Sequence, residues 1–185
     1  MKLLTTLSLL LVLLVSSLST LRATTVQRDH LTLLEVDRVK EAQILDKRIE
    51  VFIKAAERRL MVLTNTQATN AKQLKKDTEL WGDLPTGSRA ELIGDIARIL
   101  DEAITNIDDV SGRDERNPLI PKALRKLAQA VNNIMTQVTP LKDLVKSESE
   151  IASMEMLYED VQQILEAAKK LPPEVEKKGK SKAKN

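Results

Sequence analysis

His30 is the only histidine in the chain, and histidine is the side chain most used as a general base. A nucleophilic triad would have to be built on it, yet the sequence has no cysteine and no recognisable nucleophile motif. His30 stands beside Asp29 near the start of a long helical pattern. The sequence therefore predicts a surface histidine and no catalytic residue.

Carboxylates gather in two loops, and several such groups on one loop can bind calcium. If Gly112 took the sixth place of an EF-hand loop, Ile107 would stand first, where an aspartate is required. Asp77, Glu79 and Asp83 match no calcium-binding spacing. Both loops are therefore interpreted as solvated charge, and no metal site is predicted.

The chain has five glycines and lacks the G-x-G-x-x-G and G-K-[ST] motifs that hold phosphates, so no cofactor is predicted. A pair of catalytic carboxylates stays open, since 27 acidic residues allow some pair to lie close in space. An exported carboxylate-dependent hydrolase is therefore one hypothesis. It requires two acidic side chains with a raised pKa in one cleft.

Two contact candidates remain. Trp81 lies beside Gly82 in a polar segment, where an indole either caps the end of a bundle or forms a binding hot spot. Residues 174–185 form a low-complexity basic tail that is predicted to be disordered. Its lysines either keep the protein soluble or weakly attract anionic surfaces, at about 1 kcal/mol each, without a specific nucleic-acid site. These lysines are Lys177, Lys178, Lys180, Lys182 and Lys184.

Residues 1–23 have the order of a secretory signal peptide. Lys2 precedes a charge-free apolar run, residues 3–15, and small polar residues follow. The run is shorter than the roughly 20 residues that span a bilayer, so cleavage is expected and an uncleaved membrane anchor is the alternative. Three cleavage positions fit, after Ser17, Ser19 or Ala23. We therefore expect export to the periplasm or the extracellular space, and no integral membrane protein once the signal is removed.

The composition of the remaining chain favours helices. Removal of residues 1–23 leaves 27 basic and 27 acidic residues, and the body, residues 24–173, has 22 basic and 25 acidic ones. This mildly acidic body argues against a nucleic-acid-binding surface. Aliphatic residues and alanine supply the apolar side chains, with three aromatic residues in the whole chain, and this suits helix packing better than sheets. Without cysteine, stability must come from packing alone.

The pattern predicts an all-α fold, an antiparallel bundle of about four helices within residues 24–173. Apolar residues recur at three- and four-residue steps through 27–66 and predict one long helix. Residues 65–87 are polar and are expected to form a loop, although their first half can prolong that helix. The third helix reaches Val138, and Pro140 should kink or break it.

Capping boxes mark two further helix starts, since Ser88 precedes Glu91 and Ser147 precedes Glu150 by three residues. The helix after Ser88 should stop near Val110. The last helix should end at the Pro172–Pro173 pair.

The first helix would be roughly 55–60 Å long against about 33 Å for the second, and its excess needs cover from residues 65–87, another copy or a partner. The leading hypothesis is therefore a non-enzymatic helical protein that acts by helix-mediated association with itself, as a homo-oligomer, or with an envelope component. The alternatives are a small-ligand or lipid carrier with an apolar cavity and the exported hydrolase.

Overall fold

The structure is a computed structural model, and it describes residues 29–67 and 71–173. These residues form six α-helices and one 3-10 helix with no strand, so the predicted all-α class is confirmed for this part of the chain. The predicted signal peptide and basic tail lie outside the described residues. In the same part of the chain, no helix is both long and apolar enough to cross a membrane.

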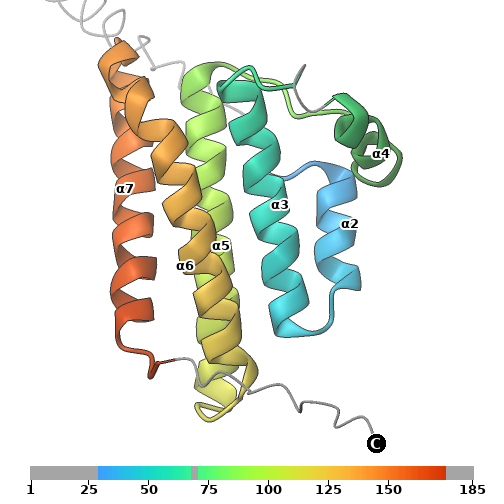
Figure 1. The fold of residues 1–185 in the computed structure, drawn as a ribbon, viewed down its shortest axis with the longest axis vertical. Coiled ribbons are helices and arrows are strands. Elements are labelled where there is room, and N and C mark those ends of the chain that lie inside the picture. Colours follow the sequence, from blue (N-terminus) through green and yellow to red (C-terminus); the bar gives the residue numbers. More distant parts are fainter. Residues whose placement is uncertain (1–28, 68–70, 174–185) are drawn as a thin grey trace, which may run out of the picture.

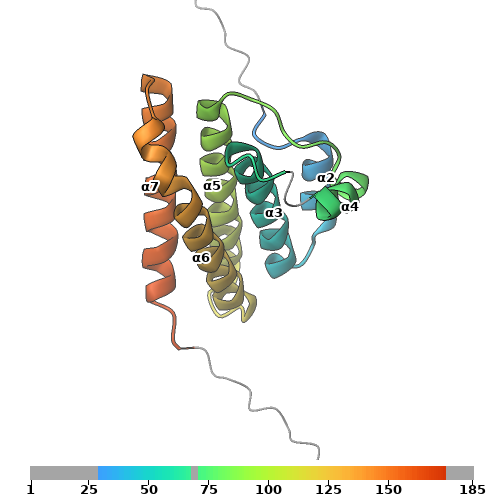
Figure 2. The same cartoon turned by 45° about the horizontal axis from the view of Figure 1, so that its top comes forward.

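Four long helices surround one core. Helices α3 and α6 run in one direction, and α5 and α7 run in the other (Figure 1). Helices α3 and α7 each pack against both α5 and α6. Helices α2 and α4 lie outside this group, on the side away from α7 (Figures 1 and 2). The bounds are α2 Leu33–Glu41, α3 Leu45–Leu63, α4 Ala71–Trp81, α5 Arg89–Arg113, α6 Leu119–Val138, η1 Thr139–Leu144 and α7 Glu148–Lys169.

The core is built from aliphatic side chains and alanine around one aromatic ring. Phe52 of α3 is fully buried, and isoleucines of the neighbouring helix α5 belong to the same core. Small residues allow close approach, since a Cβ added to Gly94 of α5 would lie 3.2 Å from the Ser153 hydroxyl of α7. Fully buried core residues include Ile49, Ile93, Ile96, Ile99, Leu100, Leu127 and Leu157.

The predicted single helix over 27–66 is wrong, because the chain turns between α2 and α3. Ala42 leaves the helical conformation at φ −78° and ψ 81°, and the carbonyl of Ala42 accepts a hydrogen bond from Arg48 Nε at 2.9 Å. Arg48 also binds Asn106 of α5, so the turn is held by the rest of the protein. The two helices then lie side by side (Figure 1). The overhang that required extra cover is absent from the described residues.

The two predicted capping boxes and the predicted interruption at Pro140 are confirmed. Ser88 and Glu91 form a capping box at the start of α5, and Ser147 and Glu150 form one at the start of α7. At Pro140 the α-helix gives way to the 3-10 helix η1, so the structure has a break there.

Two boundaries differ from prediction. Helix α5 continues three residues beyond Val110, to Arg113. The segment expected to be a loop contains α4, and Asp77 of this helix is buried and paired with Lys54 of α3 at 2.5 Å. A contact between distant segments therefore stabilises a helix that its own sequence marks weakly.

Candidate interaction surface

Exposed apolar side chains cluster on the edge formed by α2, the turn after it and α4. Leu33 is 85% exposed, Leu34 49%, Ile44 55% and Leu80 54%. Asp37 and Lys40 lie between them on α2 and form an exposed ion pair of 3.5 Å. We call these six residues the edge surface. Exposed apolar groups rimmed by charge are typical of protein contact sites.

Helix α2 cannot owe its stability to its own sequence alone, because isolated helices shorter than about 12 residues are marginal in water. Thr32 caps its start, accepting from the Glu35 amide at 3.3 Å, while Glu35 accepts from the Thr32 amide at 2.9 Å. The side chain of Glu35 then points into the protein and is fully buried. The start of α2 is therefore fixed both by its cap and by what Glu35 meets inside.

Glu35 meets two buried arginines of α3. Its Oε1 accepts from Arg58 Nε at 3.1 Å and from Arg59 Nη1 at 2.7 Å. Arg59 also donates to the carbonyls of Ala55 and His30, so it ties the chain before α2 to α3. Burial lowers the pKa of the Arg58 guanidinium, and the Glu35 charge opposes this shift. Both arginines remain charged, since an arginine side chain does not lose its proton in proteins.

Arg58 also binds the C-terminal end of α4. Arg58 Nη2 donates to the carbonyls of Trp81, Gly82 and Asp83, at 3.2, 3.1 and 2.6 Å. From α2, Arg38 donates to the carbonyl of Leu80 at 3.1 Å. Two cations therefore satisfy the last carbonyls of α4, where the helix dipole favours positive charge.

A close approach completes the junction between α2 and α4. Gly82 has φ +71°, and a Cβ added there would lie 2.8 Å from Leu34 Cδ1. Trp81, the predicted contact residue, lies at the C-terminal end of α4 and is half-buried next to the edge surface. The five tail lysines lie outside the described residues. His30 is half-buried and bonds Glu102 of α5 at 2.8 Å.

Carboxylates with altered pKa lie on several helices. A hydrogen bond from Lys122 lowers the pKa of Asp46, and one from Lys126 lowers the pKa of Glu50. Both pairs link α3 to α6. A groove of about 470 Å³ between the same two helices is lined by Glu50, Lys126 and Glu57, among others.

Burial raises the pKa of Glu57 on α3. Burial and then the charges of Asp101 and Glu159 raise the pKa of Asp160 on α7 to about 6. These two side chains with a raised pKa belong to α3 and α7, which lie on opposite sides of α5 and α6 (Figure 1), and not to the close pair that carboxylate catalysis uses.

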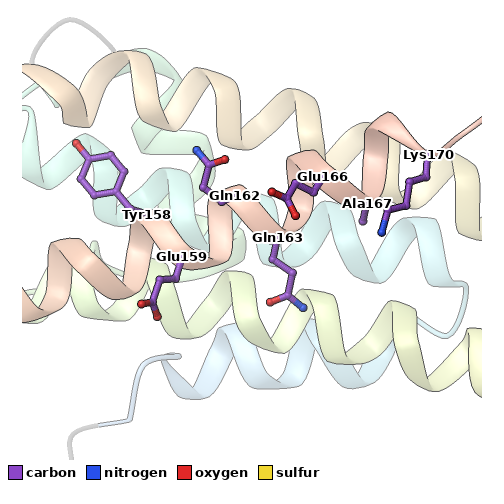
Figure 3. Close-up of a pocket in the computed structure, with 7 residues that line it drawn as sticks. All are labelled: Tyr158, Glu159, Gln162, Gln163, Glu166, Ala167 and Lys170. Atoms are coloured by element: carbon purple, nitrogen blue, oxygen red, sulfur yellow. The ribbon is translucent and has the colours of Figure 1, made fainter.

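Two surface hollows involve α7. One of about 540 Å³ is lined by residues of this helix. Tyr158 and Gln162 point to one side of the helix, and Glu159 and Gln163 point to the other (Figure 3). The other, of about 350 Å³, lies between η1 and α7 and is lined by Val145, Ile151, Met154 and Tyr158, with Lys142 6.0 Å from the ring centre.

No family model, curated protein or solved structure matches the chain. Among the described residues, no group of three or more acidic or histidine side chains could hold a metal ion.

The apolar periodicity of the sequence did not predict the buried charged side chains, because a periodicity argument assigns charged side chains to the solvent. Thr32 and Glu35 do have capping-box spacing, and this signal could have located the start of α2.

Proposed function

We propose that this is an exported, non-enzymatic helical protein that acts by helix-mediated association with itself or with an envelope component, through the edge surface. The observation that carries the proposal is the exposure of Leu33, Leu34, Ile44 and Leu80 on one edge of a protein whose core is built from buried apolar side chains. Buried on a partner, each such side chain contributes about 1.5–3 kcal/mol.

The buried ions beneath the edge surface support this assignment. A buried ion pair is often no more stabilising than apolar residues of the same size, but it can fix one arrangement of the chain. Here Arg58 joins α2, α3 and the end of α4 through Glu35 and three carbonyls. A surface held in one arrangement loses less conformational entropy on binding.

The alternatives have less support. A carrier needs an apolar cavity, and the apolar hollow beside Ile151 is an open surface feature of about 350 Å³. Native mass spectrometry of the purified protein would reveal a retained lipid and favour the carrier. A hydrolase needs paired carboxylates with raised pKa, and Glu57 and Asp160 lie on helices that are on opposite sides of α5 and α6.

The test is photo-crosslinking in an exporting host, with a photoreactive phenylalanine derivative in place of Leu33. The matched control places the same group at Gln163, an exposed position of α7. We expect protein adducts from position 33 and few from position 163. Equal yields, or none at position 33, would contradict the proposal. Fractionation and intact mass of the same material test export, which requires a chain shortened by 17, 19 or 23 residues in the periplasm or the medium.

A further inference from the structure

The exposed face of α2 carries a pattern that is complementary to itself when reversed. Leu33, Asp37, Lys40 and Ile44 are exposed and follow one another at steps of four, three and four. At about 100° per residue, the positions within α2 fall on one side of the helix. Ile44 lies beyond the C-terminal end of α2, in the turn, at the residue that precedes α3. Read in either direction, the row has apolar ends and two opposite charges between them.

We propose that this face of α2 pairs antiparallel with the same face of a second copy, about a two-fold axis. The inference rests on the proposed function of the edge surface and names its partner. Asp37 then faces the partner's Lys40, and Leu33 faces the partner's Ile44; the symmetry repeats both contacts. Contacts of this isologous kind are the commonest in homodimers.

Charge favours this pairing over a parallel one. A parallel arrangement would place like charges opposite each other, which is destabilising. In the antiparallel arrangement the existing pair between Asp37 and Lys40 becomes part of a network of four charges. The apolar ends include Leu33, which at 85% exposure is the most exposed large apolar side chain described.

The contact is small, so the dimer should be reversible. Helix α2 has nine residues, a length of about 13.5 Å. Contacts that bury less than roughly 1,200 Å² are typical of transient association. Leu34 and Leu80, exposed beside the row, can enlarge the contact. Association should therefore depend on protein concentration and weaken at high salt, where the charge network is screened.

A charge swap tests the register with the full mature chain by sedimentation velocity over a concentration series. Asp37→Lys and Lys40→Asp each place like charges across the two-fold axis, and each should weaken dimerisation at least about tenfold, or 1.4 kcal/mol. The double variant restores opposite charges and should recover the wild-type dissociation constant. Glu166→Lys, an exposed reversal on α7, is the control and should leave it unchanged.

The outcomes separate this inference from the function on which it rests. A wild-type chain that stays monomeric overturns the dimer, while adducts between position 33 and another protein would leave the proposed function standing. If both single variants weaken the dimer and the double variant does not recover, the antiparallel register is wrong. An adduct of twice the chain mass that joins position 33 to the region of Ile44 supports both. Absence of dimer and of any adduct removes both.

Discussion

Glu35 Oε1 lies 3.1 Å from Arg58 Nε, and both side chains are withdrawn from solvent, at 0% and 1% exposure. The same oxygen accepts from Arg59, so one carboxylate compensates two buried guanidinium groups. The pair joins α2 to α3 across the turn that replaces the expected continuous helix. Its loss would therefore release the edge surface from the four-helix core.

Glu35→Ala should lower the free energy of unfolding by about 3–5 kcal/mol, because it leaves two buried cations without their carboxylate. It also removes the carboxylate oxygen that accepts a hydrogen bond from the Thr32 amide. Urea unfolding measures the change. Glu41→Ala is the matched control on the same helix, since its pair with Arg38 is exposed and should contribute less than about 1 kcal/mol. Similar losses in the two variants would show that the buried cluster does not hold α2.

Two glycines should respond to alanine with opposite signs. At Gly82 the φ of +71° strains an alanine, and its Cβ would meet Leu34 Cδ1 at 2.8 Å. Gly82→Ala should therefore cost at least about 1 kcal/mol of stability. Gly112 is exposed within α5 and has no atom within 4 Å of an added Cβ, so Gly112→Ala should stabilise by about 0.4–1 kcal/mol.

Thermal unfolding of both variants, with 1 kcal/mol corresponding to about 2–4 °C, gives the comparison. A neutral Gly82→Ala variant would mean that the junction between Leu34 and the end of α4 yields easily.

What the sequence could predict was local. The capping boxes at Ser88 and Ser147 involve residues three apart, and both helices begin where these patterns place them. The break before α3 could not be predicted in this way, because the apolar period of α2 runs on into α3. It depends on Arg48, which reaches the Ala42 carbonyl and Asn106 of α5.

The edge surface was harder to predict from the sequence than the helix boundaries. Leu34 belongs to the apolar pattern that predicts one helix over 27–66 and is expected to be buried, yet it is half-exposed and lies against Gly82. The burial of Arg58 and Arg59 could not be predicted, since charge alone does not show burial. Their position follows from Glu35, which lies more than 20 residues earlier in the chain.

Glu150 should make the protein sensitive to strong acid. The Lys146 amide and then Arg89 lower the pKa of its carboxylate from the usual 4.5 to about 2. Because the folded value is the lower one, this stabilisation is present above pH 4.5 and is lost as the pH falls toward about 2. Glu150→Gln should be less stable than the wild type at pH 7, and the difference should shrink over that interval.

Chemical unfolding at several pH values tests this expectation for Glu150. Glu148→Gln changes an exposed carboxylate in the first turn of the same helix and serves as the control. A loss for Glu150→Gln that does not change between pH 7 and pH 2 would contradict an ionic origin.

Asp160 should act in the opposite direction. Its pKa is raised from 3.8 to about 6, chiefly by burial and further by the Asp101 and Glu159 charges. Since the folded state holds the proton more tightly than the unfolded state, the ionised carboxylate destabilises the protein above pH 6, and the penalty disappears as the pH falls toward 3.8.

Asp160→Asn should therefore raise stability at pH 8 and have little effect at pH 3.5. The full shift would correspond to roughly 3 kcal/mol, but the side chain is half-exposed, so solvent screening reduces the expected gain to about 1 kcal/mol, or about 2–4 °C in Tm. Asp101→Asn should lower the pKa of Asp160 without removing the burial contribution, and a carboxyl NMR titration would show this directly. A gain for Asp160→Asn that is equal at both pH values would mean that the pKa of Asp160 is the same in the folded and unfolded states, and that packing, not charge, accounts for the change.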